Sequence, residues 1–282
     1  MYIHDETIRY PDKDFHHMVQ SKKKYDYVYD DKFPYRLKAP KYRIIRVLLK
    51  IAMLVLVQPL CYVRYGLKIK GKENYKLYKK MTGRKAMITI CNHTTEWDTL
   101  FVMTSRYFSF PEFPIWQEGA ESESGMLYRE VGGLVMPIHS MRGTYYAYKA
   151  MEDVLKEEKW LHVFPEAACW TFYPAIRPFK PGTFRLAYEA KLPILPTAVV
   201  YSKPKGLYRL FKKHPNAQLN IGEPISADYD LPKKEAVRDL EERAHLAMVR
   251  LVGLKDEAEN RAVIERLPTY HVESGEPMQV HS

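Results

Sequence analysis

The chain has 282 residues, of which 46% are apolar and 28% charged, a composition typical of a folded globular protein and unlike that of a disordered one. This length allows one large domain or two ordinary ones. A mean hydropathy of −0.41 excludes a polytopic membrane protein. The three cysteines (Cys61, Cys91 and Cys169) are scattered, which argues against a disulfide framework or a cysteine-rich zinc site and favours a reducing compartment.

The net charge of +10 is concentrated in one segment. Residues 36–72 contain ten cations and no Asp or Glu, so the rest of the chain is electrically balanced. These cations flank the most apolar run, residues 44–63, whereas a nucleic-acid-binding protein usually spreads basic residues over a folded face. The combination predicts an anionic membrane surface as partner and no nucleic acid, the alternative being a solvated basic linker beside a core helix. The ten are Arg36, Lys38, Lys41, Arg43, Arg46, Lys50, Arg64, Lys68, Lys70 and Lys72.

The apolar run is short for a membrane span. Its uncharged part, residues 51–63, would be about 20 Å long as a helix, against about 30 Å of bilayer hydrocarbon. Pro59 is expected to disturb its last turn. Arg43, Arg46 and Lys50 recur at helical spacing and can reach lipid headgroups. We therefore expect an interfacial or re-entrant anchor on the cytoplasmic face of the cell membrane, peripheral or monotopic, with a single span as the alternative. A cleaved signal peptide fits the run poorly.

Four segments are predicted along the chain. They are a polar, loosely ordered N-terminal arm (1–40), a basic amphipathic membrane anchor (41–72), an α/β domain (73–267) and a flexible tail (268–282). Apolar runs predict strands at residues 86–91, 134–138, 160–164, 194–200 and 217–221. Helical patterns cover residues 97–106, 144–156 and 183–191, and a later helix should bury Val237, Leu240, Ala244, Ala247 and Leu251. This alternation predicts an α/β fold with a largely parallel sheet flanked by helices.

The end of the first predicted strand carries a candidate catalytic pair. His93 follows that strand, and Asp98 lies in the first turn of the next helix. Functional groups favour the carboxyl ends of strands in open α/β sheets. A carboxylate that orients one imidazole nitrogen leaves the other free as a general base, which can deprotonate a hydroxyl. The alternative is structural, because Thr95 and Asp98 are also spaced like a helix capping box.

Three further motifs follow in order, and together with the first they resemble the 1-acylglycerol-3-phosphate (lysophospholipid) acyltransferase family. The first motif is Asn-His followed five residues later by Asp, and the others are Phe-Pro-Glu, Phe-Lys-x-Gly and Pro-Ile-x-Pro. All four lie at predicted strand ends within residues 86–200, about half of the chain. They are Asn92-His93 with Asp98, Phe164-Pro165-Glu166, Phe179-Lys180-Pro181-Gly182 and Pro193-Ile194-Leu195-Pro196.

The resemblance implies a glycerolipid-acyltransferase-like fold behind an N-terminal anchor helix, and an O-acyltransferase of phospholipid biosynthesis. No cofactor or metal is implied, because acyl carrier protein or coenzyme A delivers the acyl group as a thioester. His93 would act as general base and Asp98 would orient it, with the acceptor attacking directly and no acyl-enzyme formed. The favoured acceptor is 1-acyl-sn-glycerol 3-phosphate. Residues implied in substrate binding are Asn92, Glu166, Lys180, Gly182 and His139. Glu166 would order either the acceptor or neighbouring backbone groups.

Two arginines of the family pattern are missing. The segment that usually reads Glu-Gly-Thr-Arg here ends in Cys169, and the strand usually followed by an arginine is followed by His139. Arginine grips phosphate with a bidentate fork that histidine and cysteine cannot copy. Arg142, Arg177 and Lys180 are the candidate replacements. The alternatives are a non-phosphate lysolipid acceptor, a thioesterase, or a non-catalytic lipid-binding relative. Cys169, which has no base of its own in the sequence pattern, is expected to serve in packing.

Overall fold

The computed structural model describes residues 7–18, 22–106, 109–204 and 215–272. Its helices are α1 (Pro40–Ala52), π-helical η1 (Met53–Val57), α2 (Gln58–Tyr65), α3 (Glu73–Thr82), α4 (Asp98–Ser105), α5 (Gln117–Glu121), α6 (Gly125–Glu130), α7 (Met141–Lys156), α8 (Gly182–Ala190), α10 (Lys233–Leu251) and α11 (Glu257–Ile264). Its strands are β1 (Tyr10–Pro11), β2 (Lys68–Lys70), β3 (Met87–Ile90), β4 (Phe113–Trp116), β5 (Gly133–Met136), β6 (Trp160–Val163), β7 (Ile194–Ser202), β8 (Asn216–Ile221) and β9 (Thr269–Tyr270).

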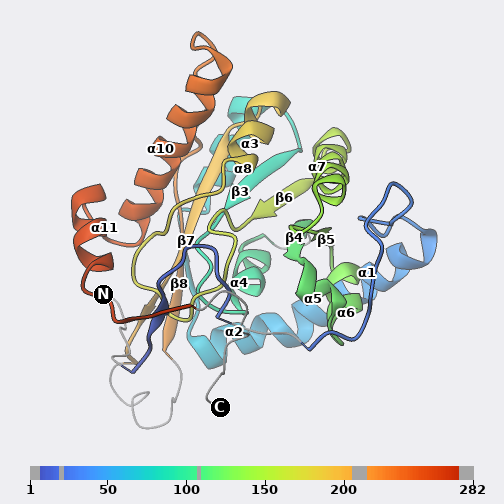
Figure 1. The fold of residues 1–282 in the computed structure, drawn as a ribbon, viewed down its shortest axis with the longest axis horizontal. Helices are drawn as coiled ribbons and strands as arrows, with labels where there is room; N and C mark the ends of the chain where they lie inside the picture. The colour runs from blue at the N-terminus through green and yellow to red at the C-terminus, as the bar shows by residue number, and fades with distance from the viewer. Residues whose placement is uncertain (1–6, 19–21, 107–108, 205–214, 273–282) are drawn as a thin grey trace.

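A five-stranded sheet in the order β2-β8-β7-β3-β6 forms the centre of the molecule (Figure 1). Strand β3 runs parallel to both neighbours, with Ile88 opposite Leu161 of β6 and Ile194 of β7. Only the β7–β8 pair is antiparallel within this sheet. A parallel bridge from Glu112 to Leu161 places the β4–β5 pair beyond β6. The carboxyl ends of β3, β6 and β7 therefore meet at one edge, and the predicted, largely parallel α/β sheet is confirmed.

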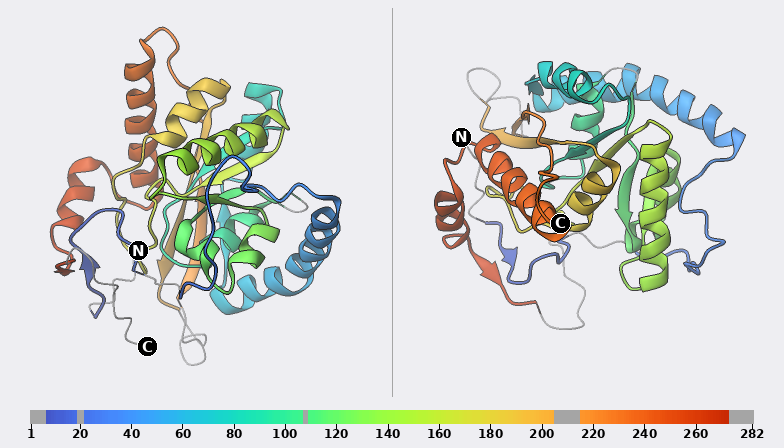
Figure 2. Two further views of the ribbon diagram at one scale, coloured as in Figure 1. Left: turned by 45° about the vertical axis from the view of Figure 1, so that its right-hand side comes forward. Right: turned by 90° about the horizontal axis from the view of Figure 1, so that it is seen from above.

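Helices cover both faces of the sheet (Figure 2). In the view from above, α7, α8 and α10 lie on one side, and α2, α3 and α4 lie on the other. The first face forms a large apolar core with buried Val154, Leu186 and Leu240, and the second includes Cys61 and Phe101. The predicted strands and helices are all present, with ends displaced by a few residues. The buried stripe of α10 differs slightly from the predicted one and comprises Ala236, Leu240, Ala244, Met248 and Val249.

The predicted anchor forms one unbroken helix from Pro40 to Tyr65, 26 residues and about 39 Å long. By length and composition it could cross a membrane. Pro59 was expected to disturb the last turn, but the wide π-helical turn η1 lies directly before it, and the helix continues through α2. Proline has no backbone N–H to donate, and a π-helical turn shifts the hydrogen-bonding pattern so that the helix continues without that bond. The end of the predicted 41–72 segment belongs to the sheet instead, because β2 pairs with β8.

The N-terminal arm packs against the α/β domain, unlike the loosely ordered segment that the sequence suggested. Arg36 is buried, and its guanidinium donates to both carboxylate oxygens of Glu112 at 2.7 Å and to Glu157 at 2.9 Å. The Tyr29 hydroxyl donates to Glu121, and β1 pairs with β9 of the predicted tail. Residues 273–282 of that tail lie outside the described residues. The described residues of the arm and residues 268–272 are thus parts of the folded domain.

Candidate active site

Two loops meet at the carboxyl edge of the sheet. One follows β3 and carries His93, and the other follows β6 and carries Glu166. The amides of Trp170 and Phe172 donate to the carbonyls of His93 and Thr94, each at 3.0 Å, so the loops are joined side by side. Parallel neighbours deliver their loops to the same edge, which explains why motifs 73 residues apart form one site.

Asp98 is the most heavily bonded side chain of the site. It is fully buried. Its Oδ2 accepts hydrogen bonds from the Nδ1 of His93 at 3.2 Å and from the backbone amides of Thr94 and Thr95 at 2.5 and 2.7 Å. Its Oδ1 accepts the hydroxyls of Thr95 at 3.0 Å and Tyr201 at 3.1 Å. The contact expected of an orienting carboxylate is therefore present, whereas the N-cap residue of α4 is Trp97 and this helix end has no side-chain cap hydrogen bond. Since the carboxylate only accepts in these bonds, Nδ1 of His93 carries the proton and Nε2 is the second, unassigned nitrogen.

The His93 imidazole lies between Phe164 and Cys169. Its ring stacks on Phe164 with centroids 4.0 Å apart, and its backbone amide donates to Glu166 at 3.1 Å. Burial alone would lower the pKa of His93, but the neighbouring Cys169 thiol and the Asp98 carboxylate outweigh burial and raise this pKa to about 10. Cys169, expected only to pack, therefore has a base beside it. Its position at the end of the altered Glu166-Ala167-Ala168-Cys169 segment was the signal that pointed here.

We expect Cys169→Ala to lower the pKa of His93 by about one to two units, the size of effect that a close charge partner produces. NMR titration of the imidazole would measure the shift, with buried Cys61→Ala as the control. A raised pKa stabilises the fold below pH 6.5, and this contribution is lost as pH rises through about 10. In the Cys169→Ala variant, the folded-state pKa of His93 is lower, so urea unfolding should show this stabilisation disappearing at a lower pH than in the unmodified protein. An unchanged His93 pKa would contradict the assigned contact.

Glu166 and Arg177 form a buried ion pair next to the backbone of His93. Their side chains are 1% and 2% exposed, and Nη2 of Arg177 lies 2.8 Å from Oε2 of Glu166. The Arg177 amide also donates to Glu166, and the guanidinium stacks on Trp170 at 4.3 Å. Within the described part of the chain, Nε and Nη1 of Arg177 are buried and have no hydrogen-bond partner. Glu166 therefore bonds to the His93 backbone, as one of its two expected roles requires, and a contact with the acceptor stays a prediction.

Asn92 joins β3 to β7. Its side-chain amide donates to the carbonyl of Val199 at 3.0 Å and accepts from the amide of Val199 at 2.8 Å. It is 1% exposed, and both ends of its amide group are occupied by this contact. Asn92 therefore positions the strand end that carries His93, and its expected role in substrate binding stays a prediction.

The remaining candidates are Lys180, Gly182, Arg142 and His139. The Lys180 ammonium sits 3.5 Å from the ring centre of Phe15, and Gly182 begins α8, where an added Cβ would meet open space. Arg142 is exposed and pairs with Asp31 at 2.8 Å, and His139 is exposed and pairs with Glu118 at 3.2 Å. Neither Arg142 nor His139 makes a hydrogen bond or ion pair with His93, Asp98 or Glu166 in the part of the chain that the structure covers.

The N-terminal arm also reaches this site, which the sequence did not predict. His17 stacks on Trp116 with centroids 5.1 Å apart, and Trp170 donates to the carbonyl of His16 at 2.6 Å. Burial, and then the positive charge of His93, lower the pKa of His17 to about 4. The adjacent His16 and His17 are the sequence feature that could have pointed to this contact, since the segment has no periodicity. No group of three His, Cys, Asp or Glu side chains suited to a metal ion occurs in residues 7–18, 22–106, 109–204 and 215–272.

Comparison with known proteins gives one family match. Residues 66–200 match the family model described as Acyltransferase, a range that includes His93, Asp98, Glu166 and Arg177. Among solved structures, the chain is similar to the 1-acyl-sn-glycerophosphate (LPA) acyltransferase PlsC from Thermotoga maritima, with 17% sequence identity and a TM-score of 0.42. That similarity covers 74% of this chain and 83% of the other. No curated protein matches the chain significantly.

Proposed function

The chain belongs to the acyltransferase family through residues 66–200, and from this we propose that it is a membrane-associated O-acyltransferase of phospholipid biosynthesis. It would move a fatty acyl chain from acyl-ACP or acyl-CoA to the hydroxyl of a lysophospholipid-like acceptor. The acceptor we favour is 1-acyl-sn-glycerol 3-phosphate. The observation that carries the proposal is His93 at the carboxyl edge of the sheet, with Nδ1 bonded to the buried Asp98.

In this mechanism, Nε2 of His93 removes the proton of the acceptor hydroxyl as its oxygen attacks the thioester carbonyl. Asp98 holds the ring and stabilises the imidazolium that forms. The same proton is then available to the departing thiolate. Because the pKa of His93 is about 10, the neutral, basic form is a minor species at neutral pH and grows about tenfold per pH unit. The transfer rate should therefore rise with pH from neutral toward 10.

Arg177 and Lys180 are the cations best placed for an acceptor phosphate. The unpartnered Nε and Nη1 of Arg177 lie behind the loop that bonds to His93, and they supply two donors. Lys180 precedes the amino end of α8, where backbone amides favour an anion. Arg142 is less suited, because it is already paired with Asp31. A neutral lysolipid acceptor is the alternative, since both arginines of the family pattern are absent.

The test is an incubation of the purified protein with labelled acyl-CoA or acyl-ACP and a panel of lysolipids, with the products measured by mass. Transfer to lysophosphatidic acid in preference to monoacylglycerol would support the proposal. Transfer to neutral acceptors alone would show that the acceptor is a neutral lysolipid and not a phosphate-bearing one. Release of free fatty acid alone would indicate a thioesterase. No turnover of thioester by a folded protein would favour a non-catalytic lipid-binding relative.

The helix Pro40–Tyr65 supports membrane association, because one side of it is apolar and exposed. Exposed Ile44, Leu48, Ile51 and Val55 recur at helical spacing, and the segment is rich in cations. The cation-rich flanks and the buried free cysteines favour the cytoplasmic face.

We expect Leu48→Glu/Val55→Glu to weaken binding to anionic vesicles at least about tenfold, since two large apolar side chains no longer insert. Sedimentation with vesicles measures the effect. The matched control is Val28→Glu, which alters an apolar residue of the arm that is 78% exposed. Equal losses in both variants would contradict the role of the helix, and retention after high-salt washing would favour a single span over an interfacial anchor.

A further inference from the structure

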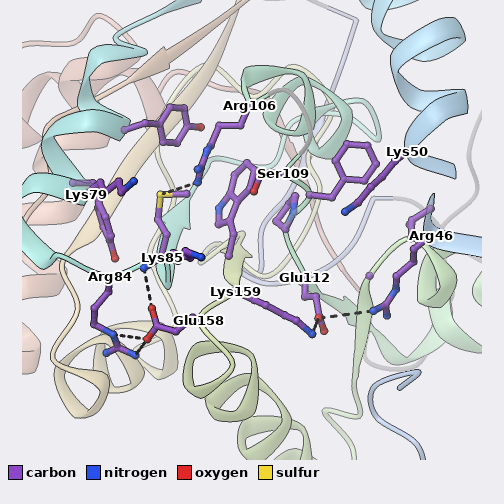
Figure 3. A pocket seen from close by; sticks show the side chains of 18 of the residues that line it. Arg46, Lys50, Lys79, Arg84, Lys85, Arg106, Ser109, Glu112, Glu158 and Lys159 are labelled. Atoms are coloured by element: carbon purple, nitrogen blue, oxygen red, sulfur yellow. Dashed lines mark hydrogen bonds and ion pairs between the residues drawn. The ribbon is translucent and has the colours of Figure 1, made fainter. Parts of the chain in front are cut away.

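A cavity lies at the amino ends of β3 and β6, the strands whose carboxyl ends lead into the loops of His93 and Glu166. It has a volume of about 520 Å³, and its lining includes Met87 and Trp160, the first residues of β3 and β6 (Figure 3). His93 follows the other end of β3, about 20 Å away along an extended chain. Helix α1 borders the cavity through Arg46, Leu49 and Lys50. The cavity is therefore separate from the His93 site and adjacent to the helix assigned to the membrane.

The lining is strongly basic. Two carboxylates are present, and both are already matched: Glu112 by Arg36, which lies outside the lining, and Glu158 by Arg84 at 2.6 Å. Figure 3 shows the cationic side chains arranged around the hollow from α1, from the end of α3, and from the starts of β3 and β6. The seven cations of the lining are Arg46, Lys50, Lys79, Arg84, Lys85, Arg106 and Lys159.

Four of these cations have no carboxylate partner within the described residues: Lys50, Lys79, Lys85 and Arg106. Arg106 lies over both the Tyr75 ring and the Trp160 ring, 5.2 and 5.5 Å from their centres. Burial lowers the pKa of Arg106, and burial together with the charges of Arg46 and Lys159 lowers the pKa of Lys50. Lys50 and Arg106 are thus partly buried cations without a carboxylate partner among the described residues, and such cations are costly unless an anion joins them.

We propose that this cavity binds a phosphate group, and that its source is the headgroup of an anionic phospholipid beneath α1. The two sides of α1 support a lipid: Arg46 and Lys50 face the cavity, whereas Ile44, Leu48 and Ile51 are exposed on the other side. A headgroup could thus enter beside a helix whose apolar side lies on the bilayer. The inference rests on the membrane association proposed above, and it is independent of acyl transfer.

The test compares Lys85→Gln/Arg106→Gln with Lys234→Gln/Lys255→Gln in the full-length chain. The control pair removes the same charge from exposed positions outside this cavity. Binding to phosphatidylcholine vesicles with and without phosphatidylglycerol is measured by sedimentation. We expect the cavity pair to lose about thirtyfold in affinity for anionic vesicles, since each basic residue near such a surface contributes about fivefold. The control pair should lose about twofold or less. Because Arg106 packs on Trp160, Lys79→Gln/Lys85→Gln serves as a second cavity variant with two exposed side chains.

Lysine acetylation read by mass spectrometry identifies the site directly. Anionic vesicles should slow acetylation of Lys50, Lys79 and Lys85 but not of Lys234 and Lys255. If inorganic phosphate protected these lysines from acetylation and anionic vesicles did not, the cavity would be an anion site, but a lipid headgroup would be overturned as the source of its phosphate. Equal affinity losses in the cavity and control pairs, or no protection by either anion, would overturn the site. Acyl transfer in detergent is followed in parallel, so failure of the proposed function is seen separately.

Discussion

Replacing His93 with alanine is expected to reduce kcat/KM for acyl transfer by roughly 10²–10⁴-fold, the usual contribution of a positioned general base. His93 is the imidazole at the carboxyl edge of the sheet whose Nδ1 is held by Asp98. Without it the acceptor hydroxyl would lose the general base that we propose. The measurement is the initial rate of transfer from labelled thioester, with circular dichroism and thermal unfolding confirming that the variant is folded.

Two comparisons make this result specific to the pair. Asp98→Asn should lose activity to a smaller extent, because an amide can present the wrong group to Nδ1 and cannot stabilise the imidazolium by charge. His271→Ala is the matched control, since His271 is exposed and pairs with Asp12. Near-normal turnover by a folded His93→Ala protein would contradict the mechanism.

Arg177→Met is expected to lower the free energy of unfolding by about 3–5 kcal/mol, the cost of leaving one member of a buried ion pair without its partner. Both side chains are at most 2% exposed, so water cannot replace the lost contact to Glu166. Equilibrium unfolding in urea measures the change. Activity should fall as well, because Glu166 also accepts the backbone amide of His93.

The control for this prediction is Arg142→Met, which breaks an exposed pair with Asp31 and should cost about 0–1 kcal/mol. The double variant Arg177→Met/Glu166→Gln should be more stable than Arg177→Met alone, since it removes the stranded charge. If Arg177→Met proved no more destabilising than Arg142→Met, the pair would not hold the loop as the structure indicates.

The sequence predicted the sheet well because buried parallel strands read as short apolar runs. Residues 86–91 and 160–164 were predicted as strands, and the structure forms β3 and β6 there. The spacing of His93 and Asp98 also predicted their contact correctly, because a strand end and the first turn of a helix leave few geometries. Their catalytic role stays a proposal.

Long-range pairing of charges could not be predicted from local patterns. Arg36 bonds to Glu112 across 76 residues, and it had been counted among the membrane-directed cations. The arm lacked periodicity because Tyr29, Phe33 and Tyr35 pack against one another along a segment of turns and bends. Strand β4 was missed because Pro114 interrupts a run of only four residues. The contact of Cys169 with His93 likewise required the loops to be joined in space.

The helix Pro40–Tyr65 is in direct contact with residues on both sides of Asp98 in the sequence. Tyr65 at the end of α2 lies against Trp97 and Phe101, with ring centroids 5.0 and 5.2 Å apart, and Arg64 covers Trp97. Trp97 directly precedes Asp98, so α2 packs against the residue next to the carboxylate. An acyltransferase docked through this helix meets its acceptor by diffusion in two dimensions. Its rate then follows the mole fraction of acceptor within the bilayer rather than the bulk concentration, and added inert lipid slows it by surface dilution.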